Sequence, residues 1–538
     1  MTTRASLLLF LLTGVLACSA EYMRPEGRTL RELLVLRRKH FGGNFGGLVL
    51  GDDPMNWKSS STIADEQAIA RDHFTILSAG WEMFPGHSWL GDGRYDYAGS
   101  DAFIEWCEET AIAVHGHGLG YNHRVGWFKN LPWQTEEQRA EVRRIYERYV
   151  RDTMTHFKGR VHLWDVCNEH VAPGGQYQSS RYLTAGWDRE ARKSVPFPYV
   201  EAYRGDLQGP TAGVEWMART FKLAHEADPE ARLIYLDFSN ETVCPTSNKI
   251  IELVRTLRAA GAPVGGVGFQ MHMNTNLKRD WDANAGHGWA TTDDYFDSIR
   301  ENVHRLGDFG LEAWGTELDF GIDAEKDLDA ELALQADLYR RLTEVCLDFD
   351  NFKGIKMWGV MDAKWNGTPI PGRPYLFDEQ GRAKPAFFAV RETLESYHPE
   401  AYGEASGRIG PWQLADAAAE GDMIRLRSDG ATAARTVDLS GLRKARLRYS
   451  WLAEGFSQGG SAAVLLEVSI ERGAWAAVKK HDGRYIAWHK GAGEGPFTAY
   501  VTLPALPRGR PVETRFRLDG NGALFQAANL ELIADAED

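Results

Sequence analysis

Eight short apolar segments alternate with longer amphipathic segments between residues 29 and about 399, and this alternation constrains the fold most. The predicted strands are residues 45–50, 74–77, 111–115, 161–166, 232–237, 265–270, 311–317 and 354–360. The segments between them carry helix signals: 212–228 stops at Pro229, and 247–260 stops at Gly261. Strand–helix alternation is typical of parallel β/α units, and eight such units close a barrel. The sequence therefore predicts an α/β fold, a (β/α)8 TIM barrel over residues 26–400.

A different pattern follows the barrel. Residues 401–410 are a Gly- and Ser-containing linker, and helical periodicity stops beyond it. Short runs then alternate apolar and polar residues, which predicts a C-terminal β-sandwich domain over residues 411–538. Its aromatic residues could form the sugar-stacking surface of a carbohydrate-binding module or fill the core of a structural module packed on the barrel: Trp412, Trp451, Trp475, Tyr485 and Trp488. The pattern favours neither reading.

The first residues and the overall charge bear on where the protein works. Residues 1–20 are typical of a secretory signal peptide, with Arg4, a short apolar run and small residues at the end. We therefore expect a secreted, periplasmic or cell-surface protein. Cys18 lies in a lipobox-like context and would make the protein a lipoprotein, while cleavage near Ala20 is the alternative. The net charge of -14 argues against nucleic acid or an anionic membrane surface as a partner. The apolar run is too short to span a membrane, and the sequence leaves the oligomeric state open.

Two strand-like segments end in glutamates. Residues 161–166 read as a buried strand that runs into Asn168 and Glu169, and residues 311–317 form a second strand that ends at Glu317. In a parallel barrel both carboxyl groups would lie at the carboxyl-terminal mouth, where barrel enzymes carry their chemistry. A pair of carboxyl groups at one site indicates a glycosidase. The alternating histidines of residues 115–117 have no third ligand at a suitable spacing, so we expect neither a metal nor another cofactor.

Several longer motifs carry a family resemblance, and they occur in order along the chain at residues 164–169, 267–272, 315–319, 358–362, 375–378 and 384–386. Over residues 30–397 the chain resembles glycoside hydrolase family 10, the family of endo-β-1,4-xylanases. The resemblance implies a retaining mechanism, in which Glu169 is the general acid/base and Glu317 is the nucleophile. It also implies a polysaccharide or oligosaccharide substrate.

Further site residues follow from the same resemblance. Asn168 is expected to bind the sugar 2-hydroxyl beside the cleaved bond, and His272 is expected to hold Glu317. The other expected substrate contacts are His117, Gln270, Trp358 and Trp365.

The glycone side of the site departs from the family pattern. Gly80, Trp81 and Phe84 stand where the family usually has glutamate, asparagine and lysine, and Tyr121 stands where it usually has tryptophan. Lost hydroxyl partners alter which sugar is accepted, because a buried polar group left unpaired costs about 1 to 3 kcal/mol. Trp81 and Tyr121 are therefore predicted substrate contacts of an altered subsite.

Three functions remain open at this point. The first is a retaining hydrolase of xylan or a related β-1,4-linked plant glycan. The second is the same mechanism on a different β-glycan or glycoside. The third is a non-catalytic glycan-binding protein, against which the two intact glutamates weigh.

Overall fold

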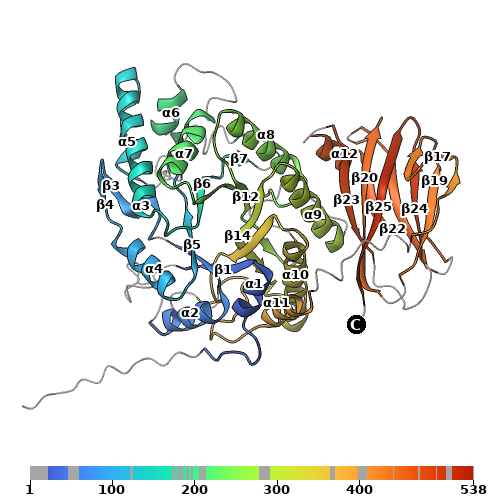
Figure 1. Cartoon of the computed structure of the whole chain (residues 1–538), viewed down its shortest axis with the longest axis horizontal. Helices are drawn as coiled ribbons and strands as arrows, with labels where there is room; N and C mark the ends of the chain where they lie inside the picture. The colour runs from blue at the N-terminus through green and yellow to red at the C-terminus, as the bar shows by residue number, and fades with distance from the viewer. Residues whose placement is uncertain are drawn as a thin grey trace, which may run out of the picture.

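The structure is a computed structural model that describes residues 22–45, 60–80, 82–120, 125–172, 176–177, 186–188, 193–195, 198–204, 214–277, 291–363, 370–397, 409–439, 442–457, 459–470, 473–491, 494–503 and 512–536. Two bodies lie side by side, a barrel wrapped in helices and a stack of two sheets (Figure 1). No helix within the described ranges is both long and apolar enough to cross a membrane.

Eight parallel strands close the barrel, as predicted. In spatial order they are β1 (His40–Phe45), β2 (Ile76–Ala79), β5 (Ala113–His117), β6 (Leu163–Asn168), β11 (Arg232–Asp237), β12 (Gly266–Phe269), β14 (Glu312–Gly321) and β15 (Phe352–Met357). Pairing of β15 with β1 completes the ring. A short strand, β13 (His272–Asn274), continues beyond β12 and pairs with the far end of β14.

Helices cover the outside of the barrel (Figure 1). The long ones are α1 (Leu30–Arg37), α2 (Ser60–His73), α4 (Ala98–Glu109), α5 (Glu136–His156), α7 (Val214–Ala227), α8 (Pro245–Ala259), α9 (Thr292–Asp308), α10 (Leu328–Asp348) and α11 (Pro385–Ser396). The connections carry short elements: α3 (Pro85–Ser88), β3 (Trp89–Gly91), β4 (Arg94–Tyr95), η2 (Phe128–Asn130), β7 (Val171–Ala172), β8 (Gln176–Tyr177), β9 (Gly186–Asp188), β10 (Lys193–Val195) and α6 (Pro198–Arg204).

The first barrel strand differs from its prediction. We expect a strand over residues 45–50, of which residues 46–50 lie outside the described residues; the structure places β1 at His40–Phe45, and its sequence is rich in glycine. A Cβ on Gly42 would lie 1.6 Å from the Ile76 oxygen, and one on Gly43 would lie 2.5 Å from the Gly359 oxygen. Close backbone approach therefore requires glycine where a strand pattern normally shows branched side chains.

The C-terminal domain is a β-sandwich of two five-stranded antiparallel sheets. One sheet contains β16 (Gln413–Ala415), β19 (Thr432–Val437), β24 (Val512–Asp519), β21 (Ala463–Ile470) and β22 (Ala476–Asp482). The other contains β17 (Ala417–Glu420), β18 (Met423–Leu426), β25 (Leu524–Ala536), β20 (Leu442–Glu454) and β23 (Phe497–Thr502). A helix, α12 (Gly483–Lys490), follows β22, although the sequence pattern predicted no helix here.

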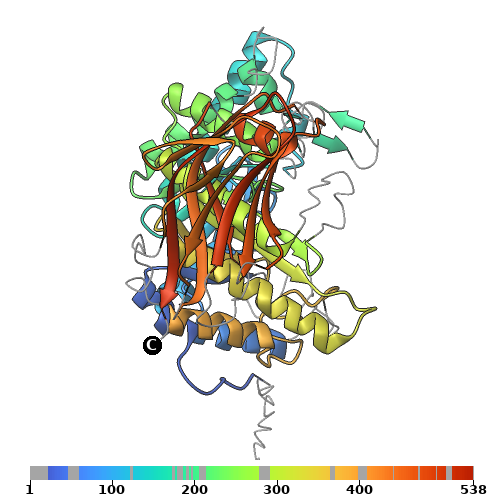
Figure 2. The ribbon, with the colours of Figure 1, turned by 90° about the vertical axis from the view of Figure 1, so that its right-hand side faces the viewer.

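The sandwich covers one side of the barrel (Figure 2). It docks on α9 and α10 through charged side chains that are buried at the interface. Glu301 of α9 accepts a hydrogen bond from Lys479 Nζ at 2.9 Å, and both side chains are at most 3% exposed. Arg446 pairs with Asp348 of α10 at 2.6 Å. Such pairs fix two bodies in one relative position, because either charge left alone in the interface would be costly.

Candidate active site

The two predicted catalytic glutamates belong to the β6 and β14 segments, which are separated in the barrel by β11 and β12. Glu169 follows β6 directly, and Glu317 lies within β14. Glu169 adopts a left-handed backbone with φ of 60°, and its N–H donates to the Leu236 oxygen at 3.0 Å. A non-glycine residue in this region costs roughly 1 to 3 kcal/mol, and such strain concentrates at functional sites.

Gln270 connects the two glutamates. Its side-chain Nε2 donates to Glu169 Oε1 at 2.9 Å and to Asn168 Oδ1 at 3.2 Å. Its backbone oxygen accepts from the Glu317 N–H at 3.1 Å. The structure therefore gathers these four predicted residues around one point. Desolvation raises the pKa of Glu169, and repulsion from Glu317 raises it further, while the hydrogen bond from Gln270 opposes both effects.

The side chain of Glu317 is held by His272, which is held in turn by Asp319. His272 Nε2 lies 3.1 Å from Glu317 Oε2, and His272 Nδ1 lies 2.6 Å from Asp319 Oδ2. Burial lowers the pKa of His272, but Asp319 and Glu317 outweigh it and raise the value to about 10. The imidazolium therefore donates to both carboxylates at neutral pH. Glu317 Oε1 has no hydrogen-bond partner among the described residues, which leaves this oxygen available to a substrate.

The side chain of His117 is held by Asp165 and packs against two aromatic rings. Its Nδ1 lies 2.7 Å from Oδ2 of Asp165, which is fully buried, and the ring of His115 approaches the other carboxylate oxygen to 2.9 Å. The His117 ring meets Trp358 edge-on at 5.4 Å and Phe84 edge-on at 5.1 Å. Phe84 is only 7% exposed, so it supports His117 and offers little open surface to a sugar.

A buried lysine lies under the site. Lys356 of β15 is 3% exposed, donates to Ser78 Oγ at 2.8 Å, and places Nζ 5.2 Å from the centre of the Trp358 ring. Burial lowers the pKa of Lys356 to about 8, although Glu317 and Asp165 both act to raise it. In the sequence, Lys356 is a single lysine inside an apolar strand, and the sequence pattern predicts no role for it.

Asp237 is a second residue near the site for which the sequence predicts no role. It ends β11 and accepts from the Val171 N–H at 3.0 Å and from the Tyr235 hydroxyl at 2.5 Å. The same hydroxyl accepts from the His170 N–H at 3.1 Å. Desolvation raises the pKa of Asp237 to about 8, against its hydrogen bonds. The Asp237–Tyr235 pair therefore holds the backbone of the two residues that follow Glu169.

Three predicted substrate contacts, Trp81, Tyr121 and Trp365, lie outside the described residues. Trp358 is partly exposed at the mouth of the barrel, and its ring also meets His272 edge-on at 6.1 Å. No group of three or more His, Cys, Asp or Glu side chains among the described residues could hold a metal ion.

Comparisons with known proteins agree with this arrangement. The model of glycosyl hydrolase family 10 matches residues 47–393. Endo-1,4-beta-xylanase B of Thermotoga neapolitana is 30% identical over 332 residues, which cover 61% of this chain and 82% of that protein. Endo-1,4-beta-xylanase C of Paenibacillus barcinonensis is 28% identical over 350 residues, which cover 61% of this chain but 29% of that longer protein.

A solved structure gives the same result. Native xylanase 10B from Thermotoga maritima is 28% identical and aligns with a TM-score of 0.55 over 68% of this chain and 98% of that chain. The family match spans well over half of the 538 residues, and it includes every barrel strand after β1 and both Glu169 and Glu317. The chain therefore belongs to glycosyl hydrolase family 10 and is a glycoside hydrolase.

Proposed function

We propose that the protein is an endo-β-1,4-xylanase-like hydrolase that cleaves xylan or a related β-1,4-linked plant glycan with retention of configuration. The observation that carries this proposal is the linked site, in which Gln270 contacts both glutamates and the His272–Asp319 pair holds Glu317. Its two carboxyl groups have different surroundings, as a retaining pair requires.

The first step uses Glu169 as an acid. Its raised pKa keeps a proton on the carboxyl group, which passes to the glycosidic oxygen as the bond to the anomeric carbon breaks. Glu317 Oε1, which has no partner among the described side chains, attacks that carbon from the other face and forms a glycosyl ester. His272 keeps the second oxygen in place during the attack.

The second step reverses these roles. The ester removes the negative charge of Glu317, and with it one cause of the raised pKa of Glu169. Glu169 then takes a proton from water, whose oxygen attacks the anomeric carbon and releases Glu317 as a carboxylate. No cofactor enters either step.

A second candidate is the same chemistry on another sugar, and it rests on the residues of the glycone side of the site. Gly80 and Phe84 replace two polar side chains of the family pattern, and Phe84 packs on His117. Product analysis on a panel of β-glycans separates the candidates. Cleavage of plain linear xylan into short oligosaccharides favours the first, and turnover of only another β-glycan favours the second. Binding with no turnover on any glycan or aryl glycoside would contradict both.

Two variants test the assigned roles. We expect Glu317→Ala to abolish turnover on every substrate. Glu169→Ala should retain activity on aryl glycosides with good leaving groups, because these need no acid, and added azide should restore the second step. A Glu169→Ala protein that azide does not rescue would contradict the acid/base assignment.

We propose further that the sandwich is mainly a structural module. Trp451 and Tyr485 are buried in it. An arginine lies over each of the other three aromatic rings: Arg435 on Trp412, Arg515 on Trp475 and Arg484 on Trp488, with guanidinium-to-centroid distances of 4.2, 4.1 and 5.1 Å. These arginines compete with a sugar for the ring faces. Affinity electrophoresis of the Glu317→Ala protein in xylan gels, with and without Trp475→Ala, tests this proposal.

We propose that the protein is exported, and this proposal rests only on the signal-peptide pattern of residues 1–20. The mass of the mature protein recovered from the producing cell distinguishes cleavage near Ala20 from a lipid on Cys18, because a diacylglyceryl group adds a large and defined mass.

A further inference from the structure

The first described segment of the chain, residues 22–39, exposes apolar side chains to solvent. Met23, Val35 and Leu36 are 75%, 65% and 70% exposed, and they are the three most exposed large apolar side chains among the described residues. Val35 and Leu36 are neighbours on α1, and the opposite face of this helix is buried on the barrel. Apolar side chains gathered on an uncovered face indicate contact with a partner.

The same segment is basic, although the chain as a whole is acidic. Residues 23–39 contain six Arg or Lys side chains and two Glu, an excess of four positive charges in a chain whose net charge is -14. Arg24, Arg28 and Arg38 are exposed. Glu32, one of the two acids, is engaged in the capping box of α1. The exposed apolar side chains of this segment are therefore accompanied by exposed positive charge.

The neighbouring helix α11 limits this basic surface on one side. Arg37 of α1 donates to the Leu394 oxygen of α11 at 3.1 Å, so the two helices are in contact. The exposed side of α11 carries the acids Glu392 and Glu395. The basic and apolar side chains therefore coincide on the α1 side of the boundary between the two helices.

Helix α1 lies at the end of the barrel opposite the active site. Arg31 donates to the Thr110 and Ala111 oxygens, each at 2.7 Å, in the connection from α4 into β5. Lys39 Nζ donates to the Phe349 oxygen at 2.7 Å, in the connection from α10 into β15. Connections from a helix into the next strand lie at the amino-terminal end of a parallel barrel. This end of the barrel is therefore the one that α1 covers.

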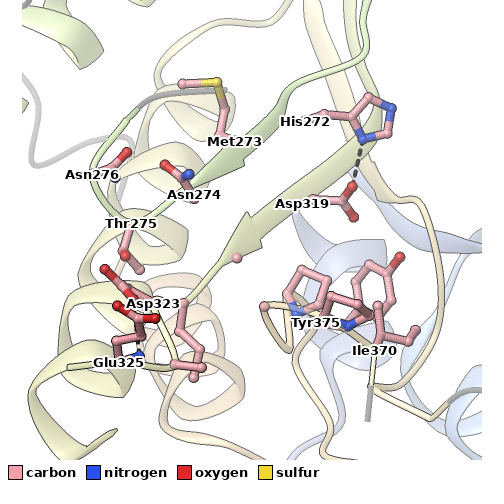
Figure 3. A pocket seen from close by; sticks show the side chains of 16 residues that line it. His272, Met273, Asn274, Thr275, Asn276, Asp319, Asp323, Glu325, Ile370 and Tyr375 are labelled. Atoms are coloured by element: carbon pink, nitrogen blue, oxygen red, sulfur yellow. Dashed lines mark hydrogen bonds and ion pairs between the residues drawn. The ribbon is translucent and has the colours of Figure 1, made fainter. Parts of the chain in front are cut away.

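The active site occupies the carboxyl-terminal end. Glu169 follows the end of β6, and His272 of β13 and Asp319 of β14 meet beyond the end of β12 (Figure 3). A flat surface in contact with α1 would therefore leave the catalytic residues accessible to a polysaccharide.

The side chain and backbone of Tyr22 hold the start of the described chain on the barrel. Its N–H donates to Asp65 Oδ1 at 2.7 Å and its hydroxyl donates to Asp72 Oδ2 at 3.0 Å, both on α2. Cys18, the predicted site of lipid attachment, lies outside the described residues and four positions before Tyr22. Four residues span at most about 14 Å. A lipid on Cys18 would therefore hold this end of the barrel close to a membrane.

We propose that the α1 surface, formed by Met23, Val35 and Leu36 with the exposed arginines beside them, rests on an anionic lipid membrane and turns the active site away from it. The apolar side chains enter the headgroup boundary, and the arginines pair with anionic lipids. A helix of eight residues is too short to hold the protein on a membrane alone, so the lipid on Cys18 supplies the anchor and α1 sets the orientation. The acidic remainder of the chain opposes this contact little, because screening limits its repulsion to about 8 Å at physiological salt.

The experiment measures the surroundings of a polarity-sensitive fluorophore attached to Leu36→Cys, in the protein as its producing cell processes it. Leu328→Cys is the matched control, because Leu328 is 46% exposed and begins α10 at the active-site end of the barrel. On vesicles that contain phosphatidylglycerol, the emission from position 36 should move to shorter wavelength and brighten by about 2-fold or more, while that from position 328 should stay unchanged. The cysteines of the barrel are buried and should not compete for the label: Cys107, Cys167, Cys244 and Cys346.

A second variant tests the apolar contact. Val35→Asp in the protein labelled at position 36 should remove more than about half of the brightening, because a carboxylate opposes entry into an anionic surface. Leu334→Asp, at a position of α10 that is 37% exposed, should leave the brightening unchanged. Thermal unfolding at the wild-type temperature shows that both variants are folded.

Four results would overturn the inference, and all of them leave the hydrolase assignment standing. No change at position 36 on any vesicle would show that α1 does not meet a membrane. Equal changes at positions 36 and 328 would show that the protein has no preferred orientation. An equal change at position 36 on pure phosphatidylcholine would reject an anionic surface. A change that appears without vesicles as the protein concentration rises would assign the α1 surface to a second copy of the chain.

Discussion

The buried Glu301–Lys479 pair gives the sharpest test of how the two domains are joined. Glu301 lies on α9 and Lys479 on β22, and their side chains are 1% and 3% exposed. Glu301 Oε1 also accepts from the Tyr500 N–H at 3.3 Å, and His489 Nε2 lies 3.3 Å from Oε2. Loss of Lys479 would leave the carboxylate in the interface with only weaker partners.

Two arguments give the expected loss in the free energy of unfolding when one partner of the pair is removed. Removal of one partner of a buried ion pair typically costs about 3 to 5 kcal/mol. Independently, Glu301 has its pKa lowered from 4.5 to about 2, because Lys479 and His489 outweigh the opposing effect of burial. At roughly 1.4 kcal/mol per pH unit, that difference corresponds to about 3 to 4 kcal/mol. We therefore expect Lys479→Met and Glu301→Gln each to lower the free energy of unfolding by about 3 kcal/mol.

A double-mutant cycle measures the pair directly. Urea unfolding of the wild type, both single variants and the double variant gives a coupling energy, which we expect to be about 2 kcal/mol or more. Lys480→Met is the matched control, since the neighbouring Lys480 side chain is 59% exposed and should change stability by less than about 0.5 kcal/mol. Additive losses in the double variant, or a Lys479→Met protein as stable as Lys480→Met, would refute the reasoning.

The Glu301–Lys479 pair also predicts how the stability of the protein depends on pH. A carboxyl group with a lowered pKa in the folded protein contributes stability above its unfolded pKa, and the contribution is lost as the pH falls toward the folded value. The difference in stability between the wild type and Glu301→Gln should therefore be full at neutral pH and shrink as the pH falls from about 4.5 toward about 2.

Three further predictions concern the active site. The basic limb of the kcat/KM profile should lie above pH 4.5, because desolvation and Glu317 raise the pKa of Glu169; a limb at or below pH 4.5 would contradict the assignment of Glu169 as the acid. Lys356→Met should lower kcat/KM by roughly 10-fold, since Glu317 loses a nearby cation, and should remove the decline above about pH 8 that we expect for the wild type. Lys353→Met, on the same strand but partly exposed, is its control, and equal effects of the two would refute the role. Asp319→Asn should lower the pKa of His272 from about 10, and NMR titration of the imidazole should show the shift together with a fall in kcat of about 100-fold.

The sequence predicted the barrel well because its signal is repeated. Each strand is a short apolar run flanked by helix signals, and β11 was predicted with the bounds that the structure shows, Arg232–Asp237. The exception was β1, in which glycines permit backbone approach to β2 and to Gly359. Glycine carries no hydrophobic signal, so the sequence pattern indicates residues 45–50 as the first strand instead.

The site was predicted where sequence order matched a motif, and it was missed where the interaction is between distant strands. Glu169, Gln270 and Glu317 all sit in recognisable strings. Lys356 does not, because its environment is made by Ser78, Glu317 and Asp165, which come from three other strands. Periodicity shows that a residue faces inward, but it cannot show which charges face it across a barrel.

The helix α10 links two features that the sequence could not show, the docked sandwich and the contacts of the segment that follows β13. Its last turns present Glu344 and Asp348 to Arg446 of the sandwich. Its first turn presents Glu331, which accepts a hydrogen bond from Thr275, the residue after β13. A helix of 21 residues is stiff over this length, so the body that fixes one end also fixes the other. If the sandwich is a structural module, as we propose, its buried charges would therefore bear on the side of the barrel that carries β13.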